Sequence, residues 1–125
     1  MAKAANDSVL DALLAKIATA TSLTVCSAQP TTRTEAVTTY KLADVTLTAG
    51  DGNGDFTIAN GDTSGRKVTV AIQSDIAIDA SGTATHVALC DASSLLFVTT
   101  CTSQALTASN TVTVPAWDIE VGDPS

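Results

Sequence analysis

Aromatic and basic residues are scarce in this sequence, and the shortage limits what the chain can bind. Only 3% of its 125 residues are aromatic, so a hydrophobic core must consist mainly of valine, isoleucine, leucine and alanine. Six lysine and arginine residues stand against thirteen aspartate and glutamate residues, which gives a formal net charge of −7. Phosphate backbones and anionic lipids require a cationic surface. We therefore expect neither nucleic acid nor a membrane as a partner.

Long hydrophobic runs are also lacking. No stretch approaches the roughly 20 apolar residues that a membrane-spanning helix needs. The first apolar segment contains Asp7 and Asp11, which the core of a signal peptide tolerates poorly. We therefore expect no signal peptide and synthesis in a reducing cytoplasm, where the three cysteines begin as thiols.

Threonine makes up roughly one residue in six, and together with valine and isoleucine it favours pleated sheets. Apolar and polar residues alternate in about eight short segments over residues 23–121, separated by glycine, aspartate, asparagine and serine. No helical pattern lies between these segments, which excludes a parallel sheet with crossover helices. The pattern predicts a mainly β fold, an antiparallel β-sandwich or flattened barrel. Residues 30–40 are polar and unpatterned, so we expect a loop there.

One α-helix is predicted ahead of the strands, over about residues 8–20, with Ser8 as its cap. Its apolar residues follow the spacing of a single helical face: Leu10, Leu13, Leu14 and Ile17. We expect the sheet or a neighbouring subunit to cover this face. The helix and the β region over about 23–121 are predicted to form a single domain, 1–125.

The stretch "AGDGNGDF" at residues 49–56 has the spacing of a calcium-binding loop. Its acidic and amide positions are Asp51, Asn53, Asp55 and Asp62. The sixth position of such a loop should be glycine, but here it is Phe56, which belongs to the apolar alternation. Three glycines among aspartate and asparagine favour a turn instead. We interpret the stretch as a turn and expect no metal and no other cofactor.

Catalytic residues are not arranged in any recognisable pattern. His86 is the only histidine, and no patterned aspartate or glycine-flanked serine accompanies it. The segment "GDTSG" at 61–65 is similar to a protease serine motif, but the chain is too short for two barrels and Asn60-Gly61 favours a hairpin turn. We expect His86 to be a half-exposed strand residue and the protein not to be an enzyme.

A hairpin is predicted over residues 84–101, and it separates two of the cysteines. A turn at its centre places Cys90 opposite Leu95 and Cys101 opposite Ala84. The two cysteines are then on the order of 20 Å apart at the rise of a strand. A disulfide requires Cα atoms within about 7 Å. We therefore expect no bond between them.

The odd number of cysteines leaves at least one thiol either free or bonded to another chain. The candidates for an interchain disulfide are Cys90 and Cys101, which the hairpin places at the ends of the sheet, and Cys26, which we expect to lie in the interior near the helix. The alternative is that all three are small buried hydrophobic residues.

Four segments follow one another over residues 61–121: "GDTSGRKVTV", "GTATHVAL", "LLFVTTCTSQALT" and "VTVPAWDIE". Together with the preceding helix and the strand around Cys26, they resemble a family of small tailed-bacteriophage proteins encoded among virion structural genes. The resemblance implies a capsid-associated or minor virion protein and supplies no catalytic motif. The cysteines and the glycine-rich loop at 50–54 are not part of the shared pattern.

This resemblance leads us to expect a structural component of a phage particle, namely a minor capsid or decoration protein bound to the major capsid lattice. Its partners would be the major capsid protein, other virion proteins and further copies of itself. Cysteines that meet an oxidising medium after cell lysis would then be able to link neighbouring subunits. A neck, collar or tail protein is the first alternative. A β module that binds a host surface or glycan is another, with Tyr40 and Trp117 as its candidate aromatic residues. Because Trp117 follows Pro115 in an apolar strand, core packing or an interface anchor is favoured for it.

Overall fold

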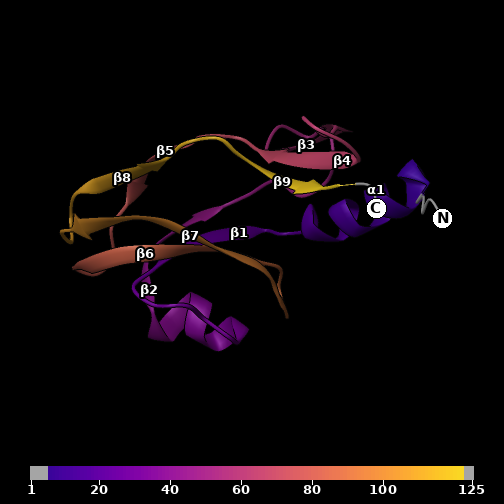
Figure 1. Ribbon diagram of the computed structural model, residues 1–125. Coiled ribbons are helices and arrows are strands. Elements are labelled where there is room, and N and C mark those ends of the chain that lie inside the picture. The colour runs from indigo at the N-terminus through magenta and orange to yellow at the C-terminus, as the bar shows by residue number, and fades with distance from the viewer. Residues whose placement is uncertain (1–5, 123–125) are drawn as a thin grey trace.

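The computed structural model describes residues 6–122, and antiparallel strands dominate that part of the chain (Figure 1). In chain order its elements are α1 (Asp7–Ile17), β1 (Ser22–Cys26), the π-helix η1 (Glu35–Thr39), β2 (Lys41–Thr46), β3 (Phe56–Asn60), β4 (Arg66–Val70), β5 (Gln73–Ala77), β6 (Gly82–Cys90), β7 (Leu95–Leu106), β8 (Thr111–Val114) and β9 (Trp117–Val121). The predicted mainly β fold with one N-terminal α-helix is confirmed. No helix between residues 6 and 122 is both long and apolar enough to cross a membrane.

Three antiparallel sheets stack in two layers. One layer is the four-stranded sheet β2-β1-β6-β7, and the other holds the three-stranded sheet β3-β4-β9 and the two-stranded sheet β5-β8. Figure 1 shows the two layers facing each other, with α1 at one end. Their inward-facing residues form one hydrophobic cluster, to which α1 also contributes. The arrangement is that of a β-sandwich.

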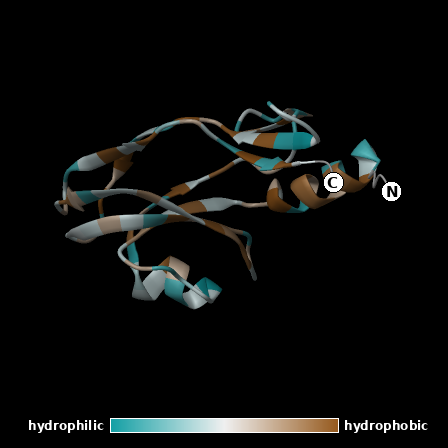
Figure 2. Ribbon diagram, viewed as in Figure 1, coloured by the Kyte–Doolittle hydropathy of each residue, from teal (hydrophilic) through white to brown (hydrophobic). Residues whose placement is uncertain are grey.

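The core between the layers is mostly aliphatic, as the scarcity of aromatic residues requires. Its largest fully buried side chain is Phe56, which is 0% exposed and therefore points inward as the alternation predicts. Leucine, valine and alanine fill most of the remaining volume. Figure 2 shows apolar and polar residues alternating along several strands. This period of two allows one face of each sheet to be buried.

Helix α1 occupies the predicted place with shifted ends. Asn6 caps it, because its side-chain Oδ1 accepts a hydrogen bond from the backbone N–H of Ser8 at 2.8 Å. The cap is therefore Asn6 rather than Ser8, and the helix ends at Ile17 instead of residue 20. Three of the four predicted apolar residues are buried, whereas Leu13 is 50% exposed. The expected apolar face is thus narrower than its sequence spacing indicates.

Segment 30–40 contains the π-helix η1, so the prediction of a plain loop is wrong. The backbone N–H and the hydroxyl of Thr31 donate hydrogen bonds to Glu35 Oε1 at 2.8 and 2.7 Å. Ala36 is fully buried together with Ala88 and Cys90 of β6. Local polar contacts and one small apolar residue order the segment, which explains why no hydrophobic period reveals it. It covers the outer side of the four-stranded sheet.

Strands β6 and β7 form the predicted hairpin with a different register. Cys90 pairs with Leu95, as expected. Ala84, however, pairs with Gln104 and not with Cys101, because the register shifts twice along the hairpin. Such bulges insert extra residues into one strand and turn it locally. Strand β7 therefore continues to Leu106, and Cys101 lies within it rather than at its end.

The last predicted strand is in fact two strands. Strand β8 pairs with β5, and β9 pairs with β4, so the two belong to different sheets. Pro115 lies between them and has no backbone N–H to donate to a ladder. The chain passes from one sheet to the next at this point.

Candidate functional site

The two layers are joined along one side and open along the other. On the joined side, Ala43 of β2 forms an antiparallel bridge with Ile78, beside β5. On the open side, β7 of one layer faces β8 and β9 of the other. Within the described residues each of these three strands pairs on one side only, with β6, β5 and β4 respectively. We call this open side, between 95–106 and 111–121, the seam.

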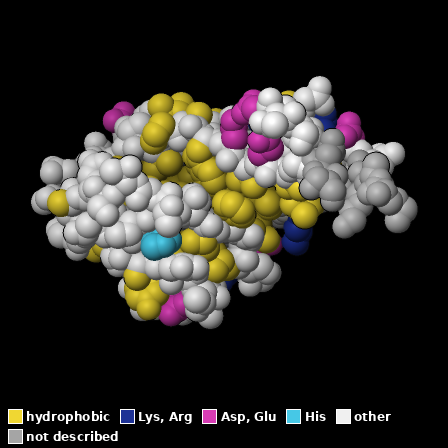
Figure 3. Space-filling view, in the orientation of Figure 1, with side chains coloured by type: hydrophobic (Ala, Val, Ile, Leu, Met, Phe, Trp, Pro, Cys, Tyr) yellow, Lys and Arg dark blue, Asp and Glu magenta, His cyan; other side chains and the backbone are white. Residues whose placement is uncertain are grey.

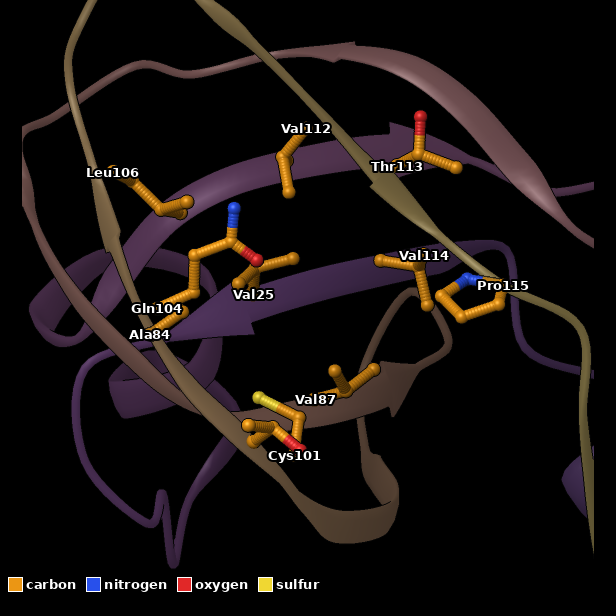
Figure 4. Close-up of a pocket in the computed structure, with 11 residues that line it drawn as sticks. Val25, Ala84, Val87, Cys101, Gln104, Leu106, Val112, Thr113, Val114 and Pro115 are labelled. Atoms are coloured by element: carbon orange, nitrogen blue, oxygen red, sulfur yellow. The ribbon is translucent and has the colours of Figure 1, made fainter.

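One hollow of 260 Å³ lies in the seam between β8 and the second half of β7 (Figure 4). Val25 and Val87 line it from β1 and β6. Val112 and Val114 point into it from β8, and the side chain of Gln104 points into it from β7. Aliphatic side chains thus make up most of its wall, with one amide among them.

A second hollow, of 280 Å³, is lined in part by Pro115 and Trp117. The ring of Trp117 contacts that of Phe97 across the seam, with centroids 6.0 Å apart and planes inclined by 32°. The indole N–H of Trp117 is buried, yet no hydrogen-bond acceptor for it lies among residues 6–122. A buried donor without an acceptor costs on the order of 1–3 kcal/mol. Trp117 is therefore held in the seam by packing and not by a hydrogen bond of its indole N–H to the described residues.

A third, wider hollow of 760 Å³ extends the seam to α1. Leu96 and Phe97 of β7 line it together with Leu13 of the helix. Leu13 is 50% exposed, and one turn earlier Val9 is 62% exposed. Figure 3 shows a band of apolar side chains over this face of the molecule. Contiguous exposed apolar surface of this kind typically marks an interaction site.

Negative charge predominates around the third hollow. Asp118 and Glu120 of β9 line it, and both are exposed. The only cation that lines it is Lys16 of α1, whose Nζ lies 4.0 Å from a carboxylate oxygen of Asp91. A carboxylate oxygen of Asp118 lies 3.4 Å from Nζ of Lys67, which also forms an ion pair with Asp62. No lysine or arginine of the described chain forms an ion pair with Glu120. The rim therefore favours a ligand that carries positive charge.

Cys26 and Cys90 are inaccessible, each with 0% exposure. The Cys26 thiol contacts the carbonyl oxygen of Ala36 at 3.6 Å, and Cys90 packs against Ala36. Burial raises the pKa of both thiols. Cys90 does end β6, but the segment that contains Ala36 covers its side chain. This corrects the expectation that another chain can reach Cys90, whereas the interior position expected for Cys26 is confirmed.

Cys101 is the one described cysteine with partial exposure. It lines the first and second hollows, and Figure 4 shows its sulfur turned toward the first. Burial raises the pKa of its thiol, so it reacts more slowly than a fully exposed cysteine. Of the three cysteines proposed for an interchain bond, only Cys101 is placed on a surface where a partner can bind.

His86 is partly buried on β6, as predicted, and its Nδ1 lies 2.8 Å from the hydroxyl of Thr85. No carboxylate of the described chain hydrogen-bonds to it. Residues 6–122 also contain no group of three or more histidine, cysteine, aspartate and glutamate side chains that could hold a metal ion. His86 therefore lacks the partners that acid–base or metal chemistry requires.

The glycine-rich stretch is a turn whose carboxylates bind the backbone. Asp51 Oδ1 accepts from the N–H of Ile58 at 2.9 Å, and Asp55 Oδ2 accepts from the N–H of Thr48 at 2.6 Å. The glycines adopt positive φ angles, which confirms the predicted turn: Gly50 at 103°, Gly52 at 81° and Gly54 at 116°. The two carboxylates therefore stabilise the turn by hydrogen bonds to residues on either side of it, Thr48 and Ile58.

No family model, curated protein or solved structure matches this chain.

Most of the seam is not apparent from sequence spacing alone. Trp117, which the sequence favours as a core residue or an interface anchor, lies in the seam and lines the second hollow. Leu13 and Phe97 are indistinguishable from core residues in the apolar pattern. One signal does point to the seam: residues 95–106 contain neither a charge nor a proline. Edge strands usually carry such residues to prevent pairing with other chains.

Proposed function

We propose that this protein is a structural component of a bacteriophage particle, a minor capsid or decoration protein bound to the major capsid lattice. The observation that carries the proposal is the seam, an apolar and open surface between two strand edges. A surface of this kind suits the binding of another polypeptide. The resemblance of residues 61–121 to virion structural proteins is the reason for placing this binding surface in a phage particle.

The environment of the polar residues supports binding rather than catalysis. The carboxylates of the glycine-rich turn accept backbone hydrogen bonds, and the single histidine contacts only a threonine hydroxyl. We therefore propose a non-enzymatic role without a cofactor. The chain would be made in the host cytoplasm and then reside in the virion. Its partners would be the major capsid protein, other virion proteins and further copies of itself, and Cys101 would be able to form a disulfide with a neighbouring chain.

A glycan-binding function is less well supported by the position of the aromatic residues. Tyr40 follows η1, on the outer side of the four-stranded sheet, whereas Trp117 lies on β9 of the other layer. The ring of Trp117 also packs against Phe97. The two rings therefore do not form a shared platform for a sugar. A neck, collar or tail position is compatible with the same seam and is an outcome of the test below.

The test is the composition and structure of purified particles. We expect mass spectrometry of gradient-purified virions to detect this chain, and a cryo-EM map to place it on the capsid shell. Density at the neck or tail would support the alternative location. Absence of the chain from particles, in a lysate that contains it, would overturn the proposal.

A non-reducing gel of the same particles tests the disulfide. Thiols are blocked before denaturation, and the lanes with and without reductant are compared. An interchain bond through Cys101 predicts a larger species that disappears on reduction and in the Cys101→Ser variant. A 12.6 kDa monomer alone in both lanes would show that the thiols are not linked between chains.

A further inference from the structure

We propose that the seam binds an extended segment of a different polypeptide, which adds as a β-strand to β7 and carries apolar residues in alternation with basic ones. The inference deepens the proposed function, on which it rests, by naming the kind of segment that the binding surface takes. It concerns the chemistry of the seam and not the location of the protein in a particle.

The first argument is the unprotected edge of β7. This strand is twelve residues long and contains no charged residue and no proline. Residues 97–100 pair with β6 in continuous register, and the two register shifts lie on either side of them, between Leu95 and Phe97 and beyond Thr100. A long edge without charge or proline is a template for another strand. Soluble proteins normally avoid exposing one.

The second argument is the shape and hydrogen bonding of the space beside that edge. The three hollows follow one another along the seam and are lined mainly by apolar side chains. An added strand points every second side chain to the same face, and such side chains suit these hollows. Its backbone also carries N–H and carbonyl groups that can hydrogen-bond to the free edge of β7. A peptide therefore fits better than a purely apolar ligand.

The third argument is charge, and it distinguishes the partner from a second copy. Asp118 and Glu120 border the third hollow, and the formal net charge of the chain is −7. Lys16 lines the same hollow, with its side chain 68% exposed and its Nζ 4.0 Å from Asp91. The other cations of the described part bind its own acids or backbone: Arg33, Lys41, Arg66 and Lys67. Two copies would bring like charges together, whereas a lysine-bearing or arginine-bearing segment meets an opposite charge.

The only tryptophan of the sequence lies in the seam, so its fluorescence reports directly on occupancy. The probe is a synthetic peptide of about eight residues, capped at both ends, in which lysine alternates with valine. A peptide with glutamate in place of lysine is the charge control. We expect the lysine peptide to shift the emission of Trp117 in a saturable manner, and the glutamate peptide to bind at least about tenfold more weakly.

Two substitutions of exposed apolar residues provide a matched pair. Leu13 lines the third hollow and is 50% exposed, whereas Ile72 is 55% exposed and lines none of the three hollows. Leu13→Lys should lower the affinity for the lysine peptide by about tenfold or more, because it removes apolar surface and adds a charge of the same sign as the peptide. Ile72→Lys should leave the affinity unchanged. Because both side chains are exposed, both variants are expected to fold, which circular dichroism checks.

Strand addition also predicts a backbone signature. Amide hydrogen exchange over 95–100 should slow when the lysine peptide binds, while exchange over β4, which already pairs on both sides, should not change. No saturable fluorescence shift, equal binding of the glutamate peptide, or equal weakening by Ile72→Lys would overturn the inference. Binding without protection of 95–100 would exclude strand addition.

A second copy as occupant is tested by sedimentation without peptide. Dimers that form through the seam, and that Leu13→Lys disrupts, would overturn the choice of a different, basic partner. The outcome is separable from the proposed function. Virions that contain the chain, combined with a peptide that does not bind, would reject this inference alone. Virions that lack the chain, combined with a peptide that binds, would reject only the role in the particle.

Discussion

Leu13 and Leu14 are neighbours on α1 in different environments, so truncating each of them measures how open the seam is. Leu14 is 0% exposed and Leu13 is 50% exposed. Leu14→Ala removes a fully buried side chain and leaves a cavity. A substitution of this kind typically lowers the free energy of unfolding by about 3–5 kcal/mol. Full burial of a leucine contributes about 1.5–3 kcal/mol, so the half-buried Leu13 should contribute about 1 kcal/mol, without a cavity.

Urea unfolding of the two variants is the assay, followed by tryptophan fluorescence and by far-ultraviolet circular dichroism. Both variants replace leucine by alanine in the interior of the same helix, so the change in helix propensity cancels in their comparison. Equal m-values would confirm that the same surface is exposed on unfolding. We expect Leu14→Ala to lose at least about 2 kcal/mol more than Leu13→Ala. Equal losses would show that Leu13 is covered in solution, and the seam would then not be open at α1.

Three further predictions concern single residues. Maleimide should label Cys101 in the native protein and Cys90 only on unfolding, because Cys90 is 0% exposed; mass spectrometry of the labelled chain decides, and native labelling of Cys90 would contradict its burial. Gly65→Ala should destabilise more than Gly52→Ala: both sites have positive φ, worth about 1–2 kcal/mol of strain, but only at Gly65 would the new Cβ overlap the backbone of β9. Equal unfolding midpoints for these two variants would count against that overlap. Finally, Asp91 accepts two backbone hydrogen bonds within its turn, and these lower its pKa. Since its pKa is lower in the folded state, its stabilising contribution is present at neutral pH and is lost as the pH falls through the folded pKa. Asp91→Ala should therefore lower stability at pH 7 and have progressively less effect below about pH 4, and an effect that grows on acidification would refute this assignment.

Periodicity predicted the parts of the fold in which burial follows the chain locally. The spacing of the apolar residues located α1, and the period of two located most of the strands and the inward direction of Phe56. Other features depend on contacts that spacing does not encode. The π-helix η1 is ordered by the hydrogen bonds between Thr31 and Glu35 and by the burial of the small residue Ala36. The division between β8 and β9 depends on Pro115 and on two different partner strands.

The candidate site was harder to predict than the fold for a related reason. Leu13 and Phe97 have the composition and spacing of core residues. Phe97 stays partly exposed on β7, which pairs on one side only within the described residues, and Leu13 is exposed where α1 borders the same opening. The cysteines illustrate the same limit. A hairpin register counted from the turn places Cys101 opposite Ala84, but the bulges move Gln104 to that position. One extra residue in a strand is enough to change which side chains face each other.

The order of the strands in the sheets has a consequence for the time at which this protein folds. Strand β1 lies between β2 and β6, and Leu23 pairs with Leu89, so an early strand acquires its second neighbour late in synthesis. Strand β4 likewise waits for β9, whose Ile119 belongs to the core. Contacts between segments so distant in the sequence slow folding and prolong the lifetime of bare strand edges. Because β9 is the last of the described strands to be synthesised, the core is completed after translation of this region rather than during it.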